Sequence, residues 1–332
     1  MKSSGIGGQA VIEGIMMKNK EAYSIAVRRP DGEIDVHLST YDSVGGKGKL
    51  RNLPVIRGVF NFVDSLVLGM RCLTHSAKFY DDEDTNPSKA DEMMQKLFKD
   101  KAEDVVMGIT VAFSVVLAVA IFMILPYFIA NYLKDYIVSD TVLAVIEGAI
   151  RLVMFIIYVL LISCMKDIQR VFRYHGAEHK CINCIENGWE LNPKNVRKAS
   201  RQHRRCGTSF MLIVMVISII FFLFIRVESP ILRVVVRIAL VPVIAGVSYE
   251  FIRFAGSSDN FFMRILSFPG MCLQRLTTKE PDRKMIEVAI AAVEAVFDWR
   301  AYQEEQGIFH EVPDDIEFIL DESNEDDEDE AE

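Results

Sequence analysis

The chain has 332 residues and a formal net charge of −9, and 51% of its residues are hydrophobic. It is too apolar to be intrinsically disordered and too long to be one small domain. Its six cysteines are too sparse for the disulfide framework of a small secreted protein, so we expect them to be reduced or to bind a metal.

The first 50 residues, 1–50, predict a small β-rich segment. Three short runs rich in β-forming residues lie at 9–17, 21–29 and 34–38, and turn-forming residues separate them as in an antiparallel meander. Residues 1–20 hold no continuous apolar core of the kind found in a secretory signal, so the N-terminus is expected to remain in the cytoplasm.

Residues 51–104 are predicted to form an amphipathic helix followed by a polar linker. From Arg51 to Leu73, apolar residues recur at helical spacing, with Arg57 and Asp64 between them. Such a helix is expected to lie on the bilayer surface or against the membrane helices.

Residues 105–250 predict a membrane domain of four transmembrane helices. A bilayer core of about 30 Å is crossed by about 20 mostly apolar helical residues. Proline lacks the N–H that a helix interior needs, so Pro126 is expected to kink the first helix. The four segments that meet or approach the required length are 105–133, 141–165, 209–225 and 231–249.

The distribution of basic residues predicts the orientation in the membrane. The connection 166–208 holds ten Lys and Arg residues, whereas the other two connections hold one each. Because basic residues in short loops stay in the cytoplasm, this connection and both termini are expected there. Membrane orientation accounts for the basic residues of this connection, so no nucleic-acid partner is expected.

The C-terminal part is predicted to be soluble. Residues 251–313 are expected to be a cytoplasmic helical region, with an amphipathic helix that begins after Pro281. Residues 314–332 are expected to be a disordered acidic tail, since nine of the last twelve residues are acidic and none is basic. This tail and the N-terminal segment are candidate surfaces for protein partners, and the lipid bilayer is the expected partner of the apolar spans.

Four charged residues lie inside the predicted spans. Glu147 and Arg151 are one helical turn apart in the second span, and Arg233 and Arg237 are in the fourth. Glu147 and Arg237 lie at similar depth, so a salt bridge between the two helices is expected. A packing clasp is favoured here over a polar pathway, and a transporter is disfavoured because the spans show no broken-helix repeats.

The segment from Tyr174 to Lys180 holds the residues best suited to chemistry. His175 and His179 are four residues apart, so on a helix both imidazoles lie on one face and can bind one divalent ion. Glu178 completes the H-x-x-E-H order of inverted zincins, in which the glutamate is the general base for the water that the metal activates. Apolar residues continue the face of the two histidines, so the rings are expected to point inward.

A third ligand is needed, and the residues alone leave several candidates open. His203 and Cys206 lie at the far end of the same connection, Cys181 and Cys184 form a C-x-x-C pair, and Glu250 follows the fourth span. Imidazole and thiolate ligands suit Zn²⁺ best, with iron as the less favoured alternative.

Four blocks of sequence accompany these residues: 7–17, 174–180, 203–210, and 276–281 with 286–292. Together they closely resemble the YqhQ-like bacterial membrane proteins, domain of unknown function 1385 (DUF1385), over a match from about Gly7 to Trp299. The resemblance implies a multi-pass protein of the bacterial cell membrane, described in places as a predicted metal-dependent enzyme but without an established reaction.

The resemblance also bears on the choice of ligands. The family pattern does not require Cys181 or Cys184, and it often has proline at the position of Arg204. It therefore favours His203 or Cys206 as the further ligand. The family's motif positions fall on His175, Glu178, His179, Glu186, His203 and Cys206.

Two functional hypotheses follow. One is a zinc-dependent hydrolase at the cytoplasmic face of the membrane, with Glu178 as the base and a peptide or another membrane-associated amide or ester as substrate. The other is a non-catalytic scaffold or regulator in which the two histidines, His203 and Cys206 close a four-ligand structural site. The number of ligands discriminates between them, because catalytic zinc keeps one position open.

Overall fold

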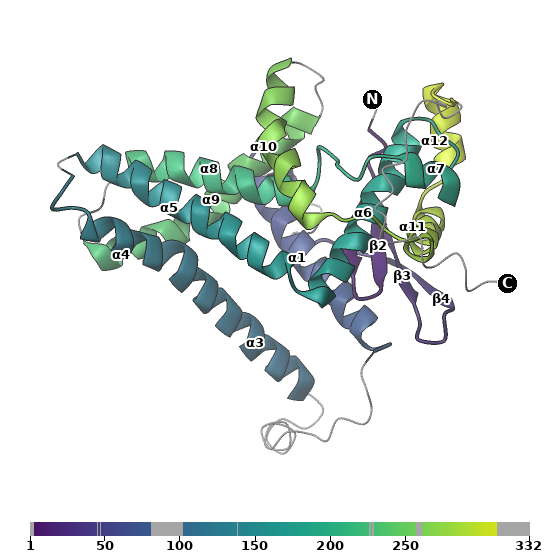
Figure 1. Cartoon of the computed structure of the whole chain (residues 1–332), viewed down its shortest axis with the longest axis horizontal. Coiled ribbons are helices and arrows are strands. Elements are labelled where there is room, and N and C mark those ends of the chain that lie inside the picture. Colours follow the sequence, from purple (N-terminus) through teal and green to yellow (C-terminus); the bar gives the residue numbers. More distant parts are fainter. Residues whose placement is uncertain are drawn as a thin grey trace. The chain divides into compact units, whose positions relative to one another are not determined.

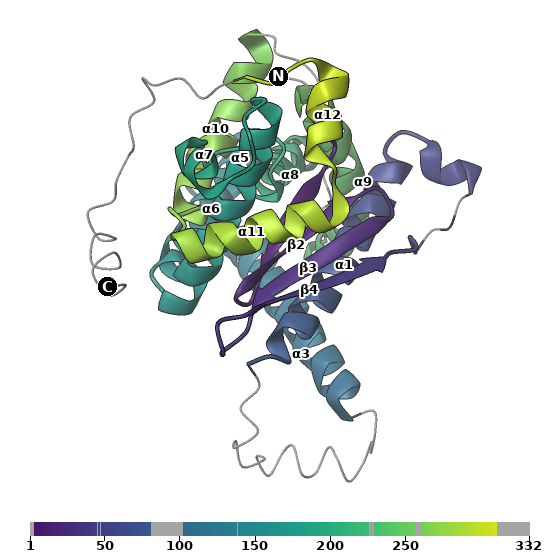
Figure 2. The ribbon, with the colours of Figure 1, turned by 90° about the vertical axis from the view of Figure 1, so that its right-hand side faces the viewer.

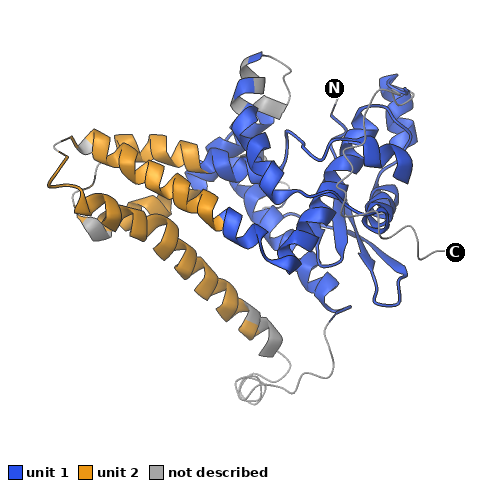
Figure 3. Ribbon diagram, viewed as in Figure 1, with its two compact units in different colours: residues 1–80, 159–214, 242–332 blue, residues 81–158, 215–241 orange. Residues whose placement is uncertain are grey.

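The computed structural model describes residues 3–44, 46, 48–80, 102–137, 139–225, 227, 229–256 and 261–310. These residues form a mostly helical protein with a four-stranded antiparallel sheet near the N-terminus (Figure 1). The predicted acidic tail, 314–332, and the polar linker between residues 81 and 101 lie outside the described residues. The chain divides into two compact units, which are residues 1–80, 159–214 and 242–332 in unit 1 and residues 81–158 and 215–241 in unit 2 (Figure 3).

The sheet of unit 1 has the predicted meander topology, but it has one more strand than the three runs indicated. The strands pair in chain order as β1 (Gly7–Val11), β2 (Gly14–Asn19), β3 (Ala22–Arg28) and β4 (Ile34–Thr40). The run 9–17 is divided because Glu13 adopts a positive φ of 50° and closes a tight turn between Val11 and Gly14. Glycine is required after this turn, since a Cβ on Gly14 would lie 2.3 Å from the carbonyl oxygen of Ala26.

Both faces of the two central strands, β2 and β3, are buried. Ile15 and Met17 on one face join a core formed with α6 (Lys166–Glu186) and α11 (Arg283–Val296). Met16 on the opposite face packs with Leu68 and Cys72 of α1 (Ile56–Ala77). Figure 2 shows α11 lying across the sheet. The amphipathic helix predicted at 51–73 is thus α1, and its apolar face covers the sheet.

The remaining helices complete the two units. Asp282 caps the N-terminus of α11 by accepting a hydrogen bond from the backbone N–H of Met285 at 2.8 Å, which agrees with the helix predicted after Pro281. Unit 1 also contains η1 (Lys49–Asn52), α7 (Pro193–Lys198), α10 (Phe261–Thr277) and α12 (Trp299–Gln306). Unit 2 contains α3 (Ala102–Val119), η3 (Ala120–Ile124) and α4 (Leu125–Tyr132), and the residues of α5 (Asp140–Ser163), α8 (Gly207–Phe224) and α9 (Pro230–Gly256) are divided between the two units.

Among the described residues, four helical segments are long and apolar enough to cross a membrane, as predicted. The first combines α3, η3 and α4, and η3 is a π-helical turn that ends two residues before Pro126. A wider turn is expected here because Pro126 has no backbone N–H and cannot donate the regular α-helical hydrogen bond. These segments make the chain a membrane protein that associates with a lipid bilayer. Their bounds are Gly108–Tyr132, Thr141–Ser163, Gly207–Phe224 and Leu232–Phe254.

Candidate metal centre

The H-x-x-E-H segment lies on α6, so its two histidines share a helix face as their spacing predicts. The ring centroids of His175 and His179 are 4.4 Å apart. The C-terminal half of α6 is buried, and His179 is only 2% exposed. Gly176 permits a close approach here, because a Cβ at this position would lie 2.0 Å from the carbonyl oxygen of Lys279. The glycine that weakens the helix prediction therefore lets the segment after α10 pass close to α6.

Backbone carbonyl groups hold both imidazole rings. Nδ1 of His175 lies 2.9 Å from the carbonyl oxygen of Thr277, and Nδ1 of His179 lies 2.7 Å from that of Arg201. A carbonyl oxygen can only accept a hydrogen bond, so each Nδ1 is the donor, and Nε2 is the unprotonated nitrogen of the ring when it binds a metal. Each Nε2 then carries a lone pair, which is the arrangement found in metal-binding histidines whose other nitrogen is held by an outer partner.

The segment that follows α7 brings Cys206 to this face of α6. Asn183 donates from Nδ2 to the carbonyl oxygens of Ser200 at 2.6 Å and Gln202 at 3.0 Å. These bonds attach the segment to α6. Sγ of Cys206, immediately before α8, lies 3.2 Å from Nε2 of His175.

Three potential ligand atoms meet at this place. One potential ligand atom from each of His175, His179 and Cys206 lies within 4.8 Å of the other two. Among the described residues, these side chains form the group of three or more potential metal ligands that lie this close together. A sulfur and a nitrogen bound to one tetrahedral zinc ion are about 3.5 Å apart. The separation of 3.2 Å between Sγ of Cys206 and Nε2 of His175 is close to that value. Two imidazoles and a thiol in this geometry fit a zinc ion.

A cavity of about 90 Å³ adjoins the three side chains, and Glu178 forms part of its wall. One water molecule needs roughly 10–15 Å³ of such space, so the cavity has room for several water molecules. Glu178 is 5% exposed, and its Oε1 accepts a hydrogen bond from the backbone N–H of Gly8 at 3.0 Å. The start of β1 therefore fixes the carboxylate beside the three potential ligands.

His203 lines the same cavity but is held by a different set of partners. Its Nε2 lies 3.5 Å from Oε2 of Glu186, and Arg205 forms a salt bridge with the other carboxylate oxygen. Burial tends to raise the pKa of the Glu186 carboxyl, but the hydrogen bond with His203 and the charge of Arg205 outweigh it and lower this pKa to about 2. The ring of His203 is 5.8 Å from that of His179, and His203 is outside the group of three ligand atoms.

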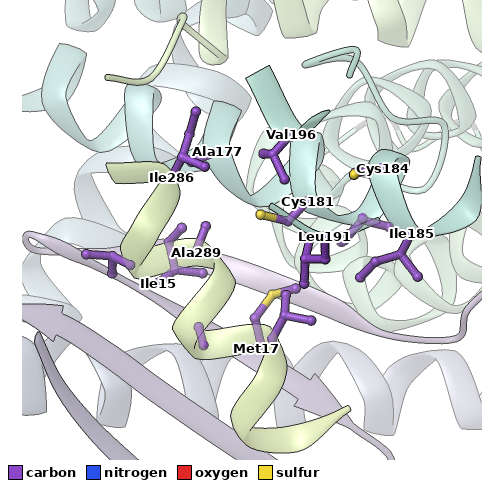
Figure 4. Packing of buried hydrophobic residues seen from close by; sticks show 14 of the residues in the cluster. Ile15, Met17, Ala177, Cys181, Cys184, Ile185, Leu191, Val196, Ile286 and Ala289 are labelled. Atoms are coloured by element: carbon purple, nitrogen blue, oxygen red, sulfur yellow. The ribbon is translucent and has the colours of Figure 1, made fainter. Parts of the chain in front are cut away.

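The other candidate ligands lie elsewhere. Cys181 and Cys184 are buried among apolar side chains of the core (Figure 4). Burial raises the pKa of the Cys181 thiol well above its usual value and that of Cys184 to about 12, which disfavours the thiolate forms that bind metals. Glu250 pairs with Arg57, with 2.5 Å between Oε1 and Nε.

Several groups that shape the site were not singled out from the sequence. The carbonyl groups of Thr277 and Arg201 act through the backbone, which leaves no side-chain signature. Oε1 of Gln274 accepts a hydrogen bond from the backbone N–H of His203 at 2.8 Å, and its Nε2 donates to the backbone carbonyl oxygen of His203 at 2.7 Å. The blocks 7–17 and 276–281, which carry the family resemblance, are the available signal, since they contain Gly8 and Thr277.

Comparisons with known proteins agree with the resemblance seen in the sequence. The family model described as "Protein of unknown function (DUF1385)" matches residues 53–299. The chain is also 32% identical over 302 residues to "Uncharacterized protein YqhQ" of Bacillus subtilis (strain 168), and this alignment covers 90% of the chain and 94% of that protein. No solved structure matches the chain. The residues matched by the family model include the three potential ligands and Glu178.

Proposed function

The chain belongs to the DUF1385 family of proteins of unknown function, and we propose that it is a zinc-dependent hydrolase of the cell membrane. The ligands in this proposal are His175, His179 and Cys206. The observation that carries the proposal is that these three side chains converge beside a cavity whose wall includes a buried carboxylate, Glu178. Three ligands, a place for water and a nearby base are the components of a catalytic zinc site.

Each residue has a chemical role in this proposal. A zinc ion held there would supply Lewis acidity, which polarises a substrate carbonyl group and makes water a better nucleophile. Gly8 holds Oε1 of Glu178, and the carboxylate accepts the proton that water loses as it attacks. Arg205 also lines the cavity, where its positive charge can stabilise negative charge on a substrate oxygen.

The position of His203 favours a catalytic site over a closed structural one. A structural zinc site uses four protein ligands, and the fourth candidate here is His203. Its Nε2 is directed to Glu186 and Arg205, and Gln274 fixes its backbone. Recruiting His203 as a ligand would break the interaction with the buried Glu186 carboxylate, which is a costly change.

We place the site on the cytoplasmic side of the membrane, with both termini on that side. Apart from one end each of the second, third and fourth spans, unit 1 is assembled from residues before the first span, between the second and third, and after the fourth. These three parts can pack together only on one side of a membrane, and an even number of spans separates each from the next. The ten basic residues between the second and third spans support the cytoplasmic side.

The test compares the purified full-length protein with its Glu178→Gln variant. Glutamine keeps a carbonyl oxygen for the N–H of Gly8 but cannot accept a proton, so we expect unchanged zinc content and loss of hydrolysis. The assay uses a panel of nitrophenyl esters and fluorogenic peptides presented in detergent micelles. Because removal of a general base costs about 10²–10⁴-fold in rate, the difference is easily measured.

Glu190→Gln is the matched control. Glu190 is an exposed carboxylate that follows α6 and does not line the cavity, so this variant should hydrolyse the panel like the wild type. Equal turnover by wild type and Glu178→Gln would contradict the assignment of the base. Hydrolysis that persists after zinc is removed would contradict the role of the metal.

A further inference from the structure

Unit 2 contains a buried cluster of charges, separate from the metal centre, formed by Glu147 and Arg151 of the second span and Arg237 of the fourth. Arg237 donates to both carboxylate oxygens of Glu147, at 2.5 and 2.9 Å, which confirms the predicted salt bridge. Arg151 donates to Oε1 of the same carboxylate at 2.9 Å. All three residues are at most 7% exposed.

The charges of this cluster do not balance. One carboxylate faces two guanidinium groups, so the cluster carries one excess positive charge. Within the described part of the chain, neither arginine pairs with a second carboxylate. Arg151 lies one residue from the middle of the 23-residue span Thr141–Ser163, where an uncompensated charge is expensive.

Arg151 holds the excess charge. Arg237 is satisfied by its two bonds to Glu147, whereas Arg151 uses one nitrogen for Glu147 and has a long contact of 3.5 Å from Nη1 to Ser218. Its Nε is buried and has no hydrogen-bond partner. Both guanidinium groups also lie over the ring of Phe222, at 5.1 and 4.8 Å, so two like charges share one aromatic face.

A small cavity adjoins these groups. Its volume is about 10 Å³, and besides the charged side chains it is lined by Ala144, Gly148, Ile219 and Phe222. This is close to the space that one water-sized particle needs. Water could satisfy Nε of Arg151 but would leave the positive charge uncompensated.

We propose that this cluster binds one monovalent anion beside Arg151. The anion accepts a hydrogen bond from Nε and neutralises the excess charge, as charge-assisted hydrogen bonds to a guanidinium group allow. A halide ion has this chemistry, and so does the anionic oxygen of a lipid phosphate group. The proposal does not depend on the metal centre, because none of its residues belongs to that site.

The test measures the thermal stability of the full-length protein in neutral detergent with gluconate as the sole anion. Chloride and bromide, exchanged for gluconate at constant ionic strength, should raise the Tm in a saturable manner. In Arg151→Gln the affinity for halide should fall roughly tenfold or more, equivalent to about 1.4 kcal/mol. Arg151→Lys keeps the charge without Nε and should show an intermediate loss.

Arg233→Gln is the matched control. Arg233 lies on the same helix as Arg237, donates to the carbonyl oxygen of Val227 at 2.9 Å and stacks over Tyr127, so its loss should not change the response to halide. A second arm adds phosphatidylglycerol or phosphatidylcholine in chloride-free buffer. A saturable, Arg151-dependent response to phosphatidylglycerol without a response to halide would identify lipid phosphate as the anion.

Crystals of the wild type soaked in bromide give a readout that does not require any variant to fold. An anomalous peak beside Nε of Arg151 would support a halide site. If neither halide nor phosphatidylglycerol changes the Tm of the wild type, the proposal is wrong.

Discussion

Replacing Gly176 with alanine should loosen the metal centre without removing any functional side chain. The added Cβ would lie 2.0 Å from the backbone oxygen of Lys279, whereas ordinary contacts are 3.4–4 Å. Lys279 is fixed there, because its N–H donates to the carbonyl oxygen of Phe172 at 2.9 Å. The two segments must therefore separate by more than an ångström, which also moves Thr277 away from His175.

The expected loss of stability in Gly176→Ala is the difference between two opposing contributions. Forcing extra atoms into a packed site costs about 1–3 kcal/mol, and the rigid backbone at this contact places the cost near the upper end. Alanine recovers about 1 kcal/mol through its higher helix propensity. The net loss of about 1–2 kcal/mol corresponds to a fall in Tm of roughly 2–8 °C.

Thermal unfolding and zinc titration of Gly176→Ala provide the assay. Loss of an outer partner of a ligating histidine lowers metal affinity by about 10–100-fold, so zinc binding should weaken as well. Gly108→Ala is the control, since no atom lies within 4 Å of a Cβ at that helical position. A Gly176→Ala protein with unchanged Tm and zinc affinity would refute the importance of this close approach.

Three further predictions concern buried polar groups. The pKa of the Glu186 carboxyl is lowered to about 2 from its usual 4.5, so this group stabilises the fold above pH 4.5 and the stabilisation is lost as the pH falls toward 2. At about 1.4 kcal/mol per pKa unit, the contribution is at most about 3 kcal/mol. The free energy of unfolding of Glu186→Gln, measured across the same acid range, should not show this loss. Glu147→Gln leaves two buried guanidinium groups without a carboxylate and should lower the free energy of unfolding by about 3–5 kcal/mol in halide-free buffer, whereas Arg233→Gln should have a much smaller effect. Replacing Cys181 and Cys184 with alanine should leave the zinc content unchanged, and loss of zinc would show that these thiols are ligands.

The membrane helices and the helical histidine pair could be predicted because each depends on local pattern. Long apolar runs identify the spans whatever surrounds them. The spacing of His175 and His179 likewise determines that they share a helix face. The turn at Glu13 escaped prediction, since a glutamate with positive φ is uncommon and the residues on both sides of it favour strands.

The rest of the candidate site depends on contacts between distant parts of the chain. Cys206 joins the histidines because side chains of α6, among them Asn183, bind the backbone of residues 200–202. Thr277 contributes a carbonyl group, which every residue possesses, so its identity carries no signal. Glu186 was known only as a motif position, and its pairing with His203 explains why His203 lies outside the group of three potential ligands.

The zinc content of the purified protein, measured by mass spectrometry beside single alanine variants, tests the three-ligand centre most directly. We expect one zinc ion per chain in the wild type, loss of zinc in His179→Ala and Cys206→Ala, and retention in His203→Ala. A wild type that binds no zinc, or a His203→Ala variant that loses it as completely as His179→Ala, would contradict the account.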